Sequence, residues 1–181
     1  DWISTNPKPA LEGERDKYSL YLDGLKIYTT IDSRMQANAE EAVSMHMKKL
    51  QAEFFNQNKP DRNKTAPFLD LEKSEIDLIM ERAMKISPRW KDMKANGKSE
   101  EEIRESFTKK TEMTVFDWQS ETKEKDTIMT PMDSIRYYKT FLRTAMMSME
   151  PQTGHVKAWV GGINYKHFQY DNVIQGARQA G

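Results

Sequence analysis

The sequence contains no cysteine and only three histidines. The absence of cysteine excludes disulfide bonds, thiolate nucleophiles and sulfur-rich zinc sites. It leaves the redox compartment open, because a protein without disulfides is compatible with the cytosol and with the periplasm alike. His46, His155 and His167 are scattered along the chain and do not have the spacing of a metal-ligand set. The sequence therefore predicts no bound metal, and no motif in it indicates a cofactor.

An excess of one charge and long apolar runs are also missing. The 28 Lys and Arg residues balance 28 Asp and Glu residues, which argues against a dedicated nucleic-acid binder, because affinity for phosphates needs an excess of cations on one face. No stretch approaches the roughly 18 to 20 apolar residues that span a bilayer. The chain begins with Asp1, which is not a natural translation start. We therefore expect a piece of a longer protein, and a signal or anchor upstream stays open.

The hydrophobic pattern predicts an α+β chain of about four helices, two β-hairpins and one early strand. Residues 1–23 carry Pro, Gly and many charges without a hydrophobic period and are expected to form a linker. The alternation in residues 25–31 (LKIYTTI) predicts a half-buried strand. Asp32 then stands at the N-cap position of an amphipathic helix over about residues 33–55.

Residues 56–130 are interpreted as an inserted helical and hairpin region. Its first stretch, NQNKPDRNKTAPF, has no apolar stripe and is expected to be a loop. Two Ser-x-x-acid pairs with capping-box spacing then start two short helices, of which the first must end before Pro88, and two strand-like runs predict a hairpin. The pairs are Ser74 with Asp77 and Ser99 with Glu102, and the runs are residues 111–118 and 125–130.

Residues 131–181 are expected to hold a helix followed by the second hairpin. Thr130, Pro131 and Asp133 give an N-cap, a proline at the first helical position and a capping acid, and the helix should run to about Thr144. Residues 145–149 and 155–160 read as two strands joined by a tight turn.

No complete active site is visible in the sequence. No serine or threonine has a base at Ser-x-x-Lys or Gly-x-Ser-x-Gly spacing. Neighbouring acids such as Glu40 and Glu41 are explained better by solvent-facing helix positions than by the paired carboxylates of glycoside hydrolysis. Gly161 and Gly162 lack the other residues of a phosphate loop and fit the end of a strand. We predict no catalytic, cofactor-binding or metal-binding residue in this chain.

Three segments, in the right order, resemble class A penicillin-binding proteins. Residues 149–164 (MEPQTGHVKAWVGGIN) are similar to the family hairpin Asp-Pro-x-Thr-Gly-x-Ile-x-Ala-x-Val-Gly-Gly, with Glu150 for Asp and Val156 for Ile. Residues 170–181 (YDNVIQGARQAG) resemble the stretch that leads into the catalytic Ser-x-x-Lys motif, and residues 23–43 resemble the segment that joins glycosyltransferase to transpeptidase. The residues that match these family motifs, and to which we assign structural roles, are Thr153, Gly154, Gly161, Gly162, Asn172, Arg178, Gln179 and Gly181.

The resemblance implies a division of the chain. Residues 1–23 would be the linker from an upstream glycosyltransferase, 24–55 the strand and helix that start the transpeptidase domain, and 56–130 an insertion that matches no quoted motif. Residues 131–181 would be the helix and hairpin that lead to the Ser-x-x-Lys motif. The fold would then be an incomplete penicillin-binding transpeptidase domain, whose early strand and last hairpin leave sheet edges for the remainder of the domain.

The resemblance also implies what the parent protein does. The nucleophilic serine would lie one position beyond Gly181, so the fragment itself would not be an enzyme. The parent would be a peptidoglycan glycosyltransferase and serine-type D-Ala-D-Ala transpeptidase, a target of penicillin, at the periplasmic face of the cytoplasmic membrane. The fragment would be soluble, with the rest of the same polypeptide as its first partner. Peptidoglycan precursors would bind through the parent, a periplasmic regulator is a further candidate partner, and no nucleic acid is expected.

The alternative is a non-catalytic interaction module. Here the 56–130 region would bind a periplasmic regulator or peptidoglycan, and its flanks would only hold it. Three aromatic residues distinguish the two interpretations, because Trp90, Phe116 and Trp118 in one exposed patch would indicate a binding surface. Burial of all three would indicate ordinary packing.

Overall fold

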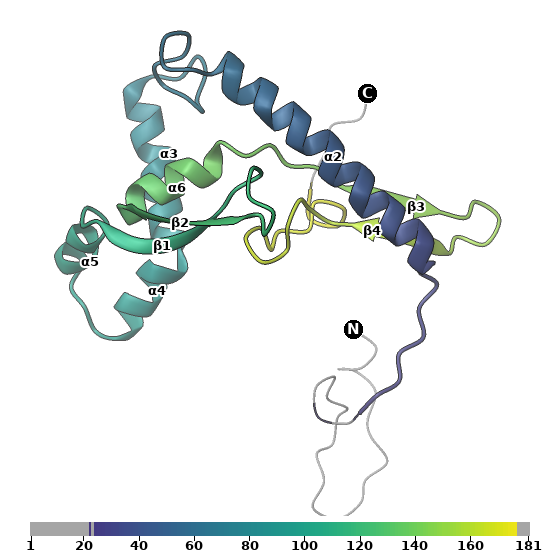
Figure 1. Ribbon diagram of the computed structural model, residues 1–181. Helices are drawn as coiled ribbons and strands as arrows, with labels where there is room; N and C mark the ends of the chain where they lie inside the picture. The colour runs from purple at the N-terminus through teal and green to yellow at the C-terminus, as the bar shows by residue number, and fades with distance from the viewer. Residues whose placement is uncertain (1–21, 23, 177–181) are drawn as a thin grey trace, which may run out of the picture.

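The computed structural model describes residue 22 and residues 24–176, with the chain running from purple to yellow in Figure 1. Apart from Leu22, the predicted linker lies outside the described residues. The motif residues Arg178, Gln179 and Gly181 also lie outside them.

The α+β class is confirmed. The described residues form five helices and two antiparallel hairpins. The helices are α2 (Ser33–Gln57), α3 (Lys73–Ile86), α4 (Pro88–Ala95), α5 (Glu100–Ser106) and α6 (Pro131–Lys139). The strands are β1 (Thr111–Phe116), β2 (Glu124–Met129), β3 (Met146–Met149) and β4 (Val156–Val160), with β1 paired to β2 and β3 paired to β4.

The long helix α2 connects the two ends of the structure. It begins as predicted, because the Asp32 carboxylate accepts hydrogen bonds from the backbone N–H groups of Arg34 (2.9 Å) and Met35 (3.0 Å). Figure 1 shows that its first turns lie along β3 and β4, while its far end reaches the loop before α3. Ala39 of α2 is buried against Ala158 and Val160 of β4, so the contact between helix and hairpin is apolar.

The predicted early strand does not form. Residues 25–31 are outside any helix or strand, and Ile27 and Tyr28 are exposed, Tyr28 by 90%. Only the end of the segment reaches β4, where the Thr30 hydroxyl donates to the Val156 carbonyl at 2.7 Å. The prediction was wrong because alternating β-branched residues fit a strand only where a neighbouring strand supplies the hydrogen-bond ladder.

Two helix starts in the 56–130 region also differ from the prediction. Ser74 and Asp77 do not cap α3, which begins at Lys73 with Glu72 as the N-cap. Helix α4 is an additional element that was not predicted, because Pro88 was interpreted as a helix stop. Proline is well tolerated at the first helical position, where its missing N–H would have no partner, and Ser87 caps this helix.

The other elements follow the sequence closely. Ser99 and Glu102 form the expected capping box, with bonds of 3.0 and 3.2 Å between each side chain and the backbone N–H of the other. Thr130 caps α6 as predicted, although the helix ends at Lys139 rather than near residue 144. Both hairpins form within two residues of their predicted bounds.

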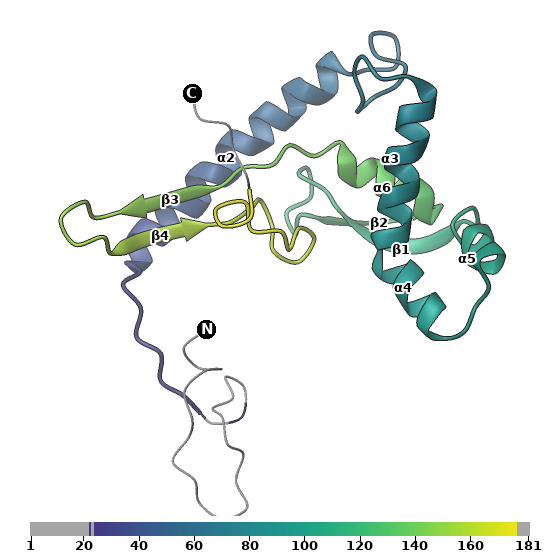
Figure 2. The same cartoon turned by 180° about the vertical axis from the view of Figure 1, so that it is seen from behind.

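Three small cores hold the structure together. One lies between α2, β1, α6 and the segment after β4, the second between α3, α4 and α5, and the third between α2 and β4. In the view from behind in Figure 2, α3, α4 and α5 lie with the β1–β2 hairpin and α6 at one end, and the β3–β4 hairpin lies at the other. Trp90, Phe116 and Trp118 are all buried in these cores, which is the result expected for ordinary packing.

Candidate functional site

The candidate site is the segment from Trp159 to Asn172, which includes the end of β4 and the chain that follows it and carries most of the described motif residues. It has no regular secondary structure after Val160. Its position therefore depends on hydrogen bonds and side-chain contacts with the rest of the chain, beginning at the β3–β4 turn.

Thr153 and Gly154 make the turn that joins β3 to β4. The Thr153 hydroxyl donates to the Glu150 carboxylate at 2.6 Å and accepts from the backbone N–H of His155 at 3.2 Å. Gly154 has φ of 74°, a left-handed conformation that favours glycine. The hydrogen bond from Thr153, with the nearby Lys157 ammonium, lowers the pKa of Glu150. These two motif residues thus fix the hairpin.

Gly161 lies where two stretches of backbone come close. A Cβ atom at this position would stand 2.7–2.9 Å from the carboxylate atoms of Asp171, which is closer than a Cβ atom lies to its non-bonded neighbours in folded proteins. The Gly161 carbonyl accepts from the backbone N–H of Asn172 (2.8 Å) and from its side-chain amide (3.0 Å). Gly162 is different, because a Cβ there would have its nearest neighbour at 3.7 Å. A side chain at Gly161 would therefore have to displace the Asp171 carboxylate, whereas Gly162 leaves room for one.

Asp171 joins β4 to the following turn, and the sequence analysis did not single it out. One carboxylate oxygen accepts from the indole N–H of Trp159 at 2.9 Å, and the other accepts from the backbone N–H groups of Val173 and Ile174. The bond from Trp159, followed by the two backbone bonds, lowers the pKa of Asp171 below its ordinary value. An Asp that precedes two residues of a turn is a local signal for such a cap.

The motif segments of residues 23–43 and 149–164 meet on β4. The Gln36 side chain donates to the Trp159 carbonyl (2.9 Å) and accepts from the Trp159 N–H (2.7 Å), so it pairs with β4 as a neighbouring strand would. The backbone N–H of Asp32 donates to the Lys157 carbonyl at 2.9 Å. Residues more than 120 positions apart in sequence are thus held together by backbone-directed bonds.

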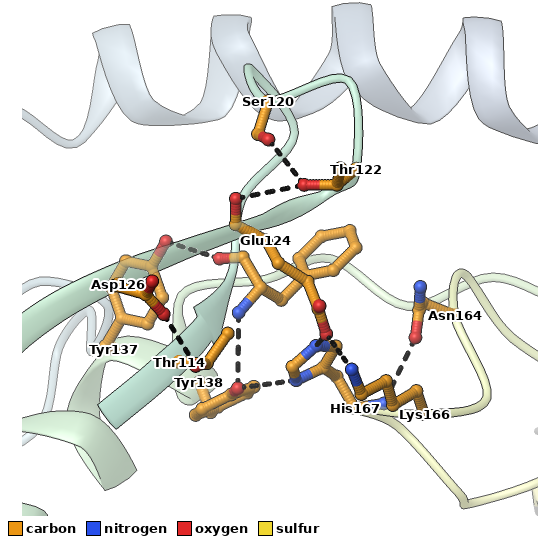
Figure 3. A network of polar contacts seen from close by, with 11 residues as sticks. Thr114, Ser120, Thr122, Glu124, Asp126, Tyr137, Tyr138, Asn164, Lys166 and His167 are labelled. Atoms are coloured by element: carbon orange, nitrogen blue, oxygen red, sulfur yellow. Dashed lines mark hydrogen bonds and ion pairs between the residues drawn. The ribbon is translucent and has the colours of Figure 1, made fainter. Parts of the chain in front are cut away.

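A polar network, shown in Figure 3, holds the far side of the segment. His167 bonds through Nε2 to the Glu124 carboxylate (2.6 Å) and through Nδ1 to the Tyr138 hydroxyl (2.8 Å). The Tyr138 oxygen also accepts from the backbone N–H of Phe116 at 3.2 Å. A neutral His167 with its proton on Nε2 satisfies each of these atoms, because the imidazole donates to Glu124 and accepts from Tyr138.

Charge and burial support the same network. The ammonium of Lys166 contacts Glu124 at 2.7 Å, and this bond, followed by that of His167, lowers the pKa of the Glu124 carboxyl. Tyr137 donates to the Phe116 carbonyl at 2.7 Å, and burial raises its pKa to about 12. The network therefore connects β1, β2 and α6 to the segment after β4.

This arrangement braces a segment of chain. Its hydroxyl and imidazole groups are occupied by structural partners, and they do not form a nucleophile with a free base. Within residue 22 and residues 24–176, no group of three or more His, Asp and Glu side chains could hold a metal ion. No helix in the same part of the chain is long and apolar enough to cross a bilayer.

Comparison with known families gives one match. Residues 63–142 match the family model of the penicillin-binding protein middle domain. This supports a penicillin-binding protein. The matched region, called the middle domain from here on after the model that it matches, begins in the loop after α2 and includes α3 to α6 with the β1–β2 hairpin. Searches of curated proteins and of solved structures found no match.

The matched middle domain lies between the motif segments that meet on β4. It covers most of residues 56–130, for which the sequence offered no quoted motif, and extends through α6. The predicted boundaries between linker, transpeptidase start, insertion and pre-catalytic segment stay predictions.

Proposed function

We propose that this chain is the non-catalytic, positioning part of a class A bifunctional peptidoglycan synthase. It would connect the glycosyltransferase to the transpeptidase and set the position of the segment that leads to the catalytic serine. The contact between the Gln36 side chain and the Trp159 backbone carries this proposal, because it joins the two segments that flank the penicillin-binding protein middle domain.

The path of the chain supports this role. The chain leaves the hairpin unit along α2, passes through the middle domain and returns after α6. At the return, the buried side chain of Gln51 in α2 donates to the Thr140 carbonyl (2.9 Å) and accepts from the Leu142 N–H (2.8 Å). The same helix is therefore bonded to the chain where it returns from the middle domain and again at β4.

The chemistry would belong to the parent protein. A serine one position beyond Gly181 would attack the penultimate D-Ala carbonyl of a stem peptide, form an acyl-enzyme and pass the peptide to an amine. The parent would act at the periplasmic face of the cytoplasmic membrane, on peptidoglycan precursors. The partner of this chain would be the rest of the same polypeptide, with a periplasmic regulator as a further partner.

The test is the intact mass of the protein after incubation with a penicillin. It compares the 181-residue chain with a version extended through its native reading frame by about the length of one further domain. We expect a covalent adduct on the extended protein alone, at the serine after Gly181.

The matched control is the extended protein with that serine replaced by alanine, which should take up no penicillin. An adduct on the unextended chain would contradict its non-catalytic role. If a well-folded extended protein forms no adduct, the transpeptidase assignment is wrong.

A further inference from the structure

A groove with a volume of about 640 Å³ lies beside α6, on the middle domain, and is named here the α6 groove. Its floor is apolar and includes the buried residues Phe107, Pro131 and Phe141. Met113 and Ile135 add apolar surface to its wall. This volume lies within the range of roughly 300–1,000 Å³ that is usual for ligand pockets, and it is large enough for one or two bulky apolar side chains.

All the charged residues that line the α6 groove are cations. They are Arg89, Lys139 and Arg143, in a chain whose formal net charge is zero. No carboxylate among the described residues lies within ion-pair distance of any of the three. Some other cations of the middle domain are paired, for example Arg104 with Glu81 at 2.7 Å, but several exposed ones are not paired with a described residue. The feature that sets the groove apart is therefore the absence of any carboxylate among the described residues that line it. The groove thus concentrates positive charge that the described chain leaves unneutralised.

Arg143 is held in place at one end of this groove. Its guanidinium carbon lies 3.8 Å from the centroid of the Phe168 ring, a cation–π contact that fixes the side chain without satisfying its N–H groups. None of those N–H groups donates to another described residue. A planar guanidinium with free donors is suited to a bidentate bond with a carboxylate.

We propose that the α6 groove binds an acidic peptide segment of another protein. An apolar side chain of that segment would lie on the floor, and its carboxylates would contact Lys139, Arg143 and Arg89. The apolar floor disfavours a nucleic acid, whose affinity comes from phosphates. The proposal goes beyond the transpeptidase assignment and does not depend on it, because none of these residues belongs to the penicillin-reactive motif.

The experiment measures fluorescence anisotropy of a fluorescein-labelled short peptide of alternating glutamate and leucine, titrated with the 181-residue chain. A peptide with lysine in place of glutamate is the charge control. We expect the acidic peptide to bind and the basic peptide not to bind. We also expect the affinity to fall as salt screens the groove cations.

Variants connect binding to the groove. Lys139→Glu removes an exposed cation that makes no ion pair with a described residue, so the fold should persist. Its Kd should rise by up to about fivefold, since an exposed ion pair contributes up to ~1 kcal/mol. Lys49→Glu, an equally exposed change on α2, should leave Kd unchanged. Ser134→Trp should weaken binding by filling the groove.

Three results would overturn the proposal. The first is the absence of binding to the acidic peptide, or equal binding of the basic one. The second is binding that Lys139→Glu and Lys49→Glu weaken to the same extent. The third is a chain that binds vesicles of anionic lipid but not the peptide, or one that only associates with a second copy of itself, seen as concentration-dependent sedimentation. The penicillin adduct does not involve the groove, so the two proposals can fail separately.

Discussion

Replacement of Gln51 by alanine should destabilise the chain more than the same change elsewhere on α2. Gln51 is only 1% exposed. Its side-chain amide donates a hydrogen bond to the Thr140 carbonyl and accepts one from the Leu142 N–H. The change leaves one backbone carbonyl and one backbone N–H without their partner and removes buried side-chain volume. Each feature has a cost that can be calculated separately.

The two lost hydrogen bonds should cost about 1 kcal/mol each. The small void that a truncated side chain leaves should add about 1 kcal/mol. The total is a decrease of about 3 kcal/mol in the free energy of unfolding. For a chain of 181 residues, at roughly 2–4 °C per kcal/mol, Tm should fall by about 6–12 °C.

Two other glutamines on α2 provide a matched series. Gln36 makes the same pair of backbone bonds, but it is only half-buried, so water can replace part of what Gln36→Ala removes and the cost should be about 1 kcal/mol. Gln57 is exposed and makes no side-chain bond to a described residue, and its replacement should change stability by less than ~0.5 kcal/mol.

Thermal and urea unfolding, followed by circular dichroism, would rank the three variants. The reasoning predicts the order Gln51, Gln36, Gln57 from most to least destabilised. It is refuted if Gln51→Ala melts within the error of Gln57→Ala, because the amide would then not be holding the segment after α6.

Two further predictions concern the segment after β4. Gly161→Ala should destabilise the chain by about 1–3 kcal/mol, since its Cβ would force the Asp171 carboxylate away from its three donors, whereas Gly162→Ala should unfold like the parent; equal melts would contradict the close approach. The hydrogen bonds from Lys166 and then from His167 lower the pKa of Glu124 from its ordinary value of 4.5. The stability that Glu124 contributes is therefore complete above pH 4.5 and is lost as the pH falls through the lowered pKa of the folded state. Glu124→Gln should therefore flatten the acid side of the stability–pH curve, and Glu112→Gln, exposed on β1, should leave that slope unchanged.

Local signals predicted most of the secondary structure correctly. Capping residues such as Asp32, Ser99 and Thr130 act within one turn of the helix that they start, so a short window of sequence contains the whole interaction. The missed α4 is also local, because Pro88 was compatible with a helix start as well as a stop. The early strand failed for the opposite reason, since a strand depends on a partner elsewhere in the chain.

The candidate site could be located from sequence, but its construction could not. The resemblance gave Gly161 and Asn172 only structural roles, and the structure shows that they are bonded to each other through the Gly161 carbonyl. Asp171 and His167, in contrast, act through partners on other elements, such as the Trp159 indole and the Glu124 carboxylate. His167 was interpreted as one of three scattered histidines, because nothing near it in sequence indicates the tyrosine and the glutamate that hold it.

The placement of the segment after β4 is coupled to both ends of the structure. On one side, Gln36 fixes Trp159 to α2; on the other, His167 fixes the segment to β2 and α6. The bonds of α2 at Gln36 and Gln51 are 15 residues apart, which is about 22 Å along a helix. Because α2 is bonded at both points, we expect it to pass a tilt of the middle domain to β4 and to the segment that follows it. Motion of the middle domain relative to the hairpin would therefore strain this segment. A partner bound in the α6 groove would also act on it directly, because Arg143 of the groove lies against the Phe168 ring of the segment.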